Sequence, residues 1–267
     1  MTAPVTVKPT PIIQHIAWTI SDTIAVTKRN LITYVRLPQL LVFSSIQPVI
    51  FVLMFRYVFG GAISVPGGSY VDFLMPGIFV QTVVFGAMNT AVGLAEDLRK
   101  GLLERFRSLP MSRAAVLAGR TLAEFVRNIW VVALMCGVGF AVGFRVHTDP
   151  WVFVSGLALL LLFGFALTWV FAFVGLSTGN AETAQAASFP VMAVLVFASS
   201  AFVPTESMPG WLQGWTNNQP VSVTLDAVRA LSIGGPTASK VLTSVAWCFG
   251  ILVVAVPIAI WRYRTKV

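Results

Sequence analysis

The 267-residue sequence contains few charged residues. Asp, Glu, Lys and Arg make up 10% of the chain, whereas soluble domains carry about 25%. A chain this poor in charge cannot cover a globular surface with polar groups, and 57% of its residues are hydrophobic. Disordered chains are excluded as well, because they combine low hydrophobicity with high charge. The composition therefore predicts an integral membrane protein.

Residues that commonly carry catalysis are also scarce. The chain has two cysteines, Cys136 and Cys248, and both lie in apolar runs, so no disulfide framework and no metal-binding spacing is expected. The two histidines, His15 and His147, fall on opposite sides of the predicted membrane. No Asp or Glu falls in the middle of a predicted span. We therefore expect no hydrolysis, phosphoryl transfer or metal catalysis, and we predict that the chain is not an enzyme.

The sequence has no phosphate-binding loop of the form GxxxxGK[ST]. Ion-coupled transporters normally place ionisable groups at mid-membrane, and none is evident in the predicted spans. Energy for active transport would then come from another chain, unless the solute moves passively. No cofactor is expected in this chain. The net charge of +8 is explained by charges that flank spans, not by binding to nucleic acid.

The apolar runs predict an all-α membrane protein with six transmembrane helices, each of which needs about 20 residues. The six-span transmembrane domain occupies residues 39–261. Its predicted spans are residues 40–59, 73–94, 125–144, 151–176, 186–203 and 241–260. The third of these has Glu124 and Arg127 at its entry. Residues 204–240 are mildly polar and are interrupted by four prolines, so they are not expected to span.

The segments outside the spans predict how the chain lies in the membrane. Residues 1–11 are rich in Pro and Thr and are predicted to be a disordered tail. Residues 12–38 show an amphipathic helical pattern that predicts an interfacial helix on the membrane surface. Fourteen of the 18 Lys and Arg residues fall on the side of the two termini, and four fall on the other side. The positive-inside rule therefore places both termini, including the tail at residues 262–267, in the cytoplasm.

The most informative segment is the predicted cytoplasmic loop at residues 95–113. It contains the run Gly101-Leu102-Leu103-Glu104-Arg105-Phe106, followed by Leu109-Pro110-Met111-Ser112-Arg113. Its apolar residues recur at helical spacing, so a short amphipathic helix could dock on a partner chain. A solvated basic loop that only sets the topology explains the same charges equally well.

This loop closely resembles the GxLER…PxSR pattern of ABC type 2 exporter permeases, in which the loop forms a coupling helix. A second match precedes the last predicted span and resembles the daunorubicin-resistance branch of that family. It consists of Met208-Pro209-Gly210-Trp211-Leu212-Gln213, Asn218-Gln219-Pro220-Val221-Ser222 and Asp226-Ala227-Val228-Arg229-Ala230-Leu231. The N-terminal helix and the six-span layout are similar too, so the resemblance covers nearly the whole chain.

The resemblance implies the permease subunit of an ATP-driven exporter of hydrophobic or amphipathic drugs or lipids. Two permease chains, identical or different, would assemble with two ATPase subunits that bind ATP and Mg²⁺. The residues that contact the ATPase would be Gly101, Leu102, Leu103, Glu104, Arg105, Phe106, Pro110 and Arg113. Residues 204–240 would form short re-entrant helices in the outer leaflet. The expected location is the cell (inner) membrane, as a multi-pass protein.

Polar and aromatic side chains in the spans and outer segment are candidates for a substrate path. They are Gln47, Phe51, Phe55, Gln81, Phe85, Asn89, Trp211 and Trp215. Polar residues within spans usually face protein or a cavity. Phenylalanines in spans more often pack helices or face lipid, and tryptophans often serve only as interfacial anchors.

Two further functions are compatible with the sequence. A permease of the same family could export a lipid-linked polysaccharide, although the segment around Asn218-Gln219-Pro220 fits the drug and lipid branch better. A passive channel or membrane scaffold belongs to a different class and would act without ATP hydrolysis or a partner chain.

Overall fold

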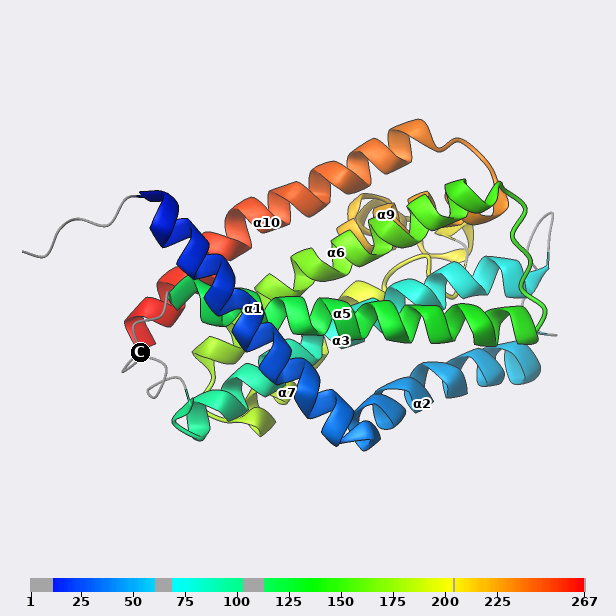
Figure 1. Cartoon of the computed structure of the whole chain (residues 1–267). Coiled ribbons are helices and arrows are strands. Elements are labelled where there is room, and N and C mark those ends of the chain that lie inside the picture. Colours follow the sequence, from blue (N-terminus) through cyan, green and yellow to red (C-terminus); the bar gives the residue numbers. More distant parts are fainter. Residues whose placement is uncertain (1–11, 61–68, 103–112, 204, 267) are drawn as a thin grey trace, which may run out of the picture.

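The computed structural model describes residues 12–60, 69–102, 113–203 and 205–266, and all regular structure in these ranges is helical (Figure 1). The main helices are α1 (Ile12–Arg36), α2 (Pro38–Met54), α3 (Tyr70–Arg99), α5 (Arg113–Ala141), α6 (Pro150–Ser177), α7 (Ala181–Phe197), α8 (Gly210–Asn218), α9 (Pro220–Ile233) and α10 (Ala238–Lys266). A π-helical turn, Phe55–Phe59, follows α2, and a 3-10 turn, Thr205–Ser207, precedes α8. The predicted tail at residues 1–11 lies outside the described residues.

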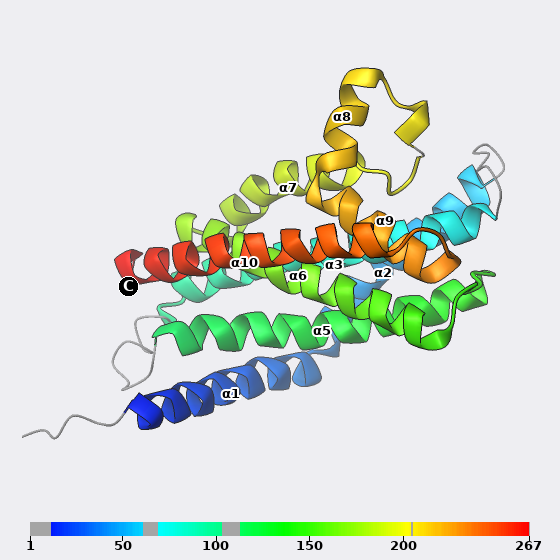
Figure 2. The same cartoon turned by 90° about the horizontal axis from the view of Figure 1, so that it is seen from above.

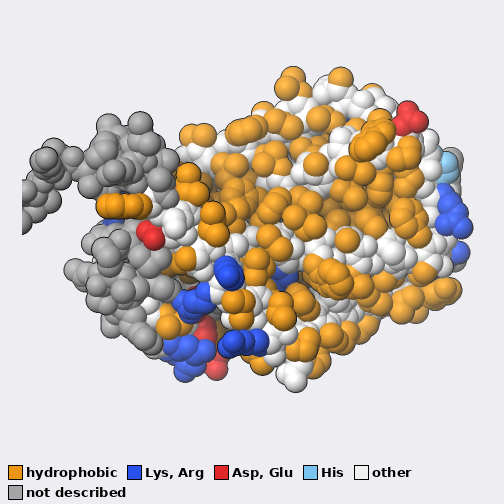
Figure 3. Space-filling model, viewed as in Figure 1, with side chains coloured by type: hydrophobic (Ala, Val, Ile, Leu, Met, Phe, Trp, Pro, Cys, Tyr) orange, Lys and Arg blue, Asp and Glu red, His pale blue; other side chains and the backbone are white. Residues whose placement is uncertain are grey.

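The long helices form one bundle around α3 (Figures 1 and 2). In α3, 89% of the most apolar stretch is buried, whereas the corresponding share is 17% in both α2 and α10. The start of α1, the end of α3, the start of α5 and the end of α10 gather at one end of the bundle (Figure 1). In the view of Figure 3, a broad apolar band separates basic side chains near the two ends. This distribution matches a bundle that crosses a bilayer.

Five helices in the described residues are long and apolar enough to cross a membrane, namely α2 with its π-helical turn, α3, α5, α6 and α10. Helix α7 is apolar but has 17 residues. It begins at Ala181 instead of the predicted residue 186, because the Asn180 side chain caps it by accepting the N–H of Thr183 at 2.8 Å. It ends at Phe197, six residues before the predicted end of the span.

Helix α5 begins at Arg113, well before the predicted start of the third span at residue 125. The first turns of α5 pack against α1, where the Thr27 hydroxyl donates to the carbonyl of Gly119 at 3.2 Å. Charged residues interrupt the apolar pattern of these turns, so hydropathy alone does not detect them as part of the span. As a result, Glu124 and Arg127 lie inside the helix and not at its entry. Glu124 thus belongs to a helix that is long and apolar enough to cross a membrane, and the predicted span at residues 125–144 left it out.

Helix α3 also continues further than predicted, to Arg99. Gly101 follows in a left-handed conformation with φ of 66°, and its N–H donates to the carbonyl of Leu98 at 3.0 Å. Glycine adopts this conformation without the steric cost of a Cβ atom, and it commonly ends helices. The first part of the predicted coupling loop is therefore the last turn of α3.

Arg229 of α9 joins three segments at the opposite end of the bundle. Its Nη2 donates to the carbonyls of Ser200 at 2.9 Å and Phe73 at 3.3 Å. Its guanidinium carbon lies 3.9 Å from the centre of the Phe73 ring, and Nη1 donates to Asp226 at 3.3 Å. Arg229 thereby fastens α9 to the start of α3 and to the segment after α7.

Candidate functional site

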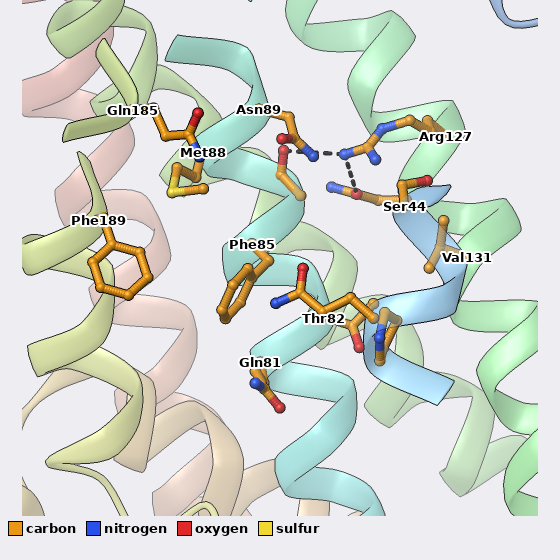
Figure 4. Close-up of a pocket in the computed structure, with 14 residues that line it drawn as sticks. Ser44, Gln81, Thr82, Phe85, Met88, Asn89, Arg127, Val131, Gln185 and Phe189 are labelled. Carbon is orange, nitrogen blue, oxygen red and sulfur yellow. Dashed lines mark hydrogen bonds between the residues drawn. The ribbon is translucent and has the colours of Figure 1, made fainter. Parts of the chain in front are cut away.

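A cavity of about 300 Å³ lies between α2, α3, α5 and α7 (Figure 4). Helix α3 contributes Gln81, Thr82, Phe85, Gly86, Met88 and Asn89 to its wall, and α2 contributes Ser44, Gln47 and Pro48. Arg127, Asn128 and Val131 come from α5, and Gln185 and Phe189 come from α7. The cavity is thus rich in amide side chains, although the helices that surround it are mainly apolar.

Four of the predicted substrate-path residues line this cavity: Gln47, Gln81, Phe85 and Asn89. Gln81, Phe85 and Asn89 recur at intervals of four, so they follow one stripe along α3. The structure therefore brings these four residues to one place. Their contact with a substrate stays a prediction.

The other four predicted substrate-path residues lie elsewhere. Phe51 and Phe55 stack on each other with ring centres 6.1 Å apart, and Phe55 stacks on Phe202 at 4.6 Å. Trp211 and Trp215 lie on α8 with 79% and 51% of their surface exposed. None of the four belongs to the cavity wall.

The three described residues among the predicted ATPase-coupling residues lie at helix ends that gather beside the chain's C-terminus (Figure 1). Gly101 and Leu102 follow the end of α3, and Arg113 is the first residue of α5. Leu103, Glu104, Arg105, Phe106 and Pro110 lie outside the described residues. Contact with an ATPase stays a prediction for the whole segment.

Arg127 and Asn128 are cavity residues that the sequence did not single out. The Arg127 Nε donates to Glu124 Oε2 at 2.7 Å, and Nη2 donates to the carbonyl of Gly86 on α3 at 3.1 Å. The Arg127 and Glu124 side chains are 4% and 1% exposed. Gly86 permits this approach, because a Cβ atom there would collide with the amide oxygen of Asn128. The sequence did contain a signal for this pair, because Glu124 and Arg127 are opposite charges three residues apart in a mainly apolar helix.

Residues of α1, α3 and the preceding turn of α5 extend this ion pair into a larger network. The Tyr34 hydroxyl of α1 donates to Glu124 Oε1 at 2.6 Å. Arg120 lies 3.8 Å from Glu124 and donates to Asp97 of α3 at 3.0 Å. Burial, together with the charge of Glu124, raises the pKa of Tyr34 above its ordinary value of 10.0, so the phenol remains a donor at neutral pH. We call Tyr34, Asp97, Arg120, Glu124 and Arg127 the buried network.

The cavity opens sideways between α2 and α7. Gln47, Asn89, Gln185 and Phe189 line it and are also exposed at the surface of the chain. Among the described residues that line it, Arg127 is the charged one and none is acidic. The site therefore offers hydrogen-bonding groups and one guanidinium beside two aromatic rings.

Comparison with known proteins assigns the family. The model described as ABC-2 type transporter matches residues 21–232. A daunorubicin resistance ABC transporter permease of Streptomyces coeruleorubidus is 33% identical over 250 residues, which cover 94% of this chain and 88% of that protein. A probable doxorubicin resistance ABC transporter permease of Mycobacterium tuberculosis is 30% identical over 249 residues, covering 92% and 90%. A putative transport permease of Cyanophora paradoxa is 28% identical over 216 residues, covering 79% and 74%. The resemblance seen in the sequence is confirmed, and the chain belongs to the ABC-2 type transporter family.

Proposed function

We propose that this chain is the membrane subunit of an exporter that moves hydrophobic or amphipathic drugs or lipids outward. The observation that carries the proposal is the amide-rich, partly aromatic cavity inside a bundle of apolar helices that belongs to a transporter family. Such a cavity can bind an amphipathic molecule by its polar and apolar parts at once. The drug-resistance names of two relatives support this class of substrate.

Energy for export comes from two separate ATPase subunits, which bind ATP and Mg²⁺. Family membership supports this partner, and the sequence has no phosphate-binding loop of its own. The segment from Gly101 to Arg113 contacts the ATPase and passes its movement to α3 and α5, which the segment joins. The chain itself is a transport subunit and not an enzyme.

The chain crosses the cell membrane six times, with α7 as the additional span and with both termini in the cytoplasm. At 1.5 Å per residue, α7 is about 26 Å long, close to the hydrocarbon thickness of about 30 Å. α1 lies on the cytoplasmic surface, and the short helices α8 and α9 enter the outer leaflet without crossing it. A membrane-impermeant maleimide should label His147→Cys in intact cells and should label Thr265→Cys only after permeabilisation. Labelling of both before permeabilisation would contradict this topology.

A second permease chain, identical or different, covers the mouth of the cavity between α2 and α7. Gln47, Asn89 and Gln185 would otherwise face lipid, where unpaired polar groups are costly. If the two chains are identical, oxidation of Phe189→Cys should then cross-link them, while Trp151→Cys, on α6, should not. Equal cross-linking at both positions would argue against this interface.

The exporter proposal is tested by purifying the tagged permease with the proteins encoded beside it. A nucleotide-binding chain should co-purify, and amphipathic compounds should stimulate its ATP hydrolysis. Reversing the charges at Glu104 and Arg105 should abolish this stimulation without preventing membrane insertion. A well-folded permease that has no partner and moves solute without ATP would instead be a passive channel. Unchanged stimulation in the double variant would remove the coupling role of these two residues.

A further inference from the structure

The polar and apolar side chains of the cavity are arranged in layers. In Figure 4, Gln185, Asn89 and Arg127 lie at one level, toward the end of the bundle that holds the last turn of α3. The rings of Phe189 and Phe85 lie at the next level, closer to the middle of the bundle, and one further amide, Gln81, lies beyond them. A ligand that fills both layers needs a polar head and an apolar body.

Arg127 has hydrogen-bonding capacity beyond its contacts in the bundle. Its Nε is bound to Glu124, and its Nη2 is shared between the carbonyl of Gly86 and the Asn128 oxygen at 3.1 and 3.4 Å. Among the residues that the structure describes, no acceptor is placed for Nη1. The guanidinium belongs to the cavity wall, so a ligand oxygen can take this remaining donor position (Figure 4).

Arg127 gives the cavity wall a positive charge. The carboxylate that balances Arg127 belongs to Glu124, which is buried behind it and is not part of the wall. Both oxygens of Glu124 already accept hydrogen bonds, one from Tyr34 and one from Arg127. A ligand head group in the cavity is therefore closer to the cation than to its counter-ion. This position attracts anions and repels cations.

We infer that the cavity selects an amphiphile with an anionic, oxygen-rich head group of the phosphate type. Arg127 holds the head group, since guanidinium matches the geometry of phosphate oxygens. Asn89 and Gln185 supply further amide donors, and the apolar chain lies against Phe85 and Phe189. Resting on the proposed exporter topology, this pose has the head toward the cytoplasm and the tail toward the membrane centre. That is the orientation of a lipid in the inner leaflet.

The test compares three lipids with the same dioleoyl tails. The full-length permease, purified in a neutral detergent, is mixed with dioleoyl phosphatidic acid, dioleoylglycerol or the cationic dioleoyl-trimethylammonium-propane, and bound lipid is counted by native mass spectrometry. Phosphatidic acid should bind about tenfold more tightly than dioleoylglycerol, as expected for a hydrogen bond to a charged group. The cationic lipid should bind most weakly. Equal binding of the three lipids would overturn the inference.

Variants then assign the selectivity to Arg127. Changing Glu124→Gln and Arg127→Gln together removes both charges of the pair and leaves the net charge of the chain unchanged. The preference for phosphatidic acid should disappear, while binding of dioleoylglycerol should persist. Arg145→Gln, a matched loss of an exposed arginine outside the cavity, should keep the preference. If the double variant does not fold, Arg127→Lys keeps the charge but loses the planar donor pair, and its preference should fall without vanishing. An unchanged preference in these Arg127 variants would overturn the assignment.

Two further measurements separate the possible explanations. Inorganic phosphate at millimolar concentration should not displace phosphatidic acid, and displacement would mean that the site takes free phosphate instead of a lipid. ATP hydrolysis that responds equally to all three lipids would overturn the charge selectivity but leave the exporter function intact. Charge-selective binding by a permease that has no ATPase partner would support the site and overturn the exporter function.

Discussion

The hydrogen bond between Tyr34 and Glu124 ties α1 to the buried carboxylate of α5, and its removal is a sharp test. Tyr34→Phe deletes one hydroxyl and keeps the ring. The lost bond is 2.6 Å long and is made to a carboxylate that is almost fully buried. Hydrogen bonds to charged groups contribute about 1.5–3 kcal/mol. Arg120 still lies 3.8 Å from the same carboxylate oxygen. The loss of stability should therefore be smaller than that of breaking a buried ion pair, which costs about 3–5 kcal/mol. We expect the free energy of unfolding to fall by about 2 kcal/mol.

The assay is reversible unfolding of the full-length chain in bicelles, with Tyr57→Phe as the control. Tyr57 is 72% exposed, so its loss should change stability by less than about 0.5 kcal/mol. Combining Tyr34→Phe with Glu124→Gln in a double-mutant cycle isolates the coupling between the two side chains, which should be about 1–2 kcal/mol. A coupling indistinguishable from zero would refute the reasoning that this bond holds α1 against α5.

Three further predictions use the same unfolding measurement. Gly93→Ala places a methyl group against the Arg120 guanidinium and should lower stability by about 1–3 kcal/mol, whereas an unchanged value would mean that the guanidinium moves away without loss. Arg229→Met removes charge-assisted bonds to two backbone carbonyls and should cost about 1.5–3 kcal/mol; a neutral result would contradict its role in fastening α9. Because burial raises the pKa of Tyr34 above 10.0, the stability from its protonated phenol is complete below that pH and is lost as pH rises further. In Tyr34→Phe, the free energy of unfolding should fall less steeply with pH in this range than in the unsubstituted protein. Identical pH profiles of stability in the two proteins would contradict this prediction.

The helical fold was predictable because hydropathy detects runs that are apolar on all sides. The all-helical class and the long apolar helices follow from it directly. The start of α5 was not predictable in this way, since Arg113, Arg120 and Glu124 interrupt the pattern there. Arg120 pairs with Asp97 of α3, and Glu124 accepts a hydrogen bond from Tyr34 of α1; both partners are far away in the sequence. Hydropathy scores each residue alone and therefore placed the start of this span too late in the chain.

The candidate site was predictable only in part. Polar residues in an apolar helix imply a protein-facing position, and this reasoning found Gln81 and Asn89 on α3. Phenylalanine gives no such signal: Phe85 lines the cavity, whereas Phe55 stacks in an aromatic cluster. Arg127 was overlooked because it was assigned to the edge of a span, where a charge needs no explanation.

The position of the buried network is better explained by the charge that it presents to the cavity than by its contribution to stability. A buried ion pair is seldom more stabilising than well-packed apolar residues, because both charges lose their hydration. An unpaired arginine beside the cavity would be costly, and a carboxylate in the cavity wall would cancel its charge. Placing Glu124 behind Arg127 meets both conditions, since the pair is neutral while its positive edge faces the cavity. Tyr34 of α1 donates to Glu124, and Glu124 in turn accepts a hydrogen bond from Arg127 in the cavity wall. The position of α1 is thereby linked to Arg127 through Glu124. A shift of α1 would change the position of Glu124 and, through it, the donor groups that Arg127 presents to a ligand.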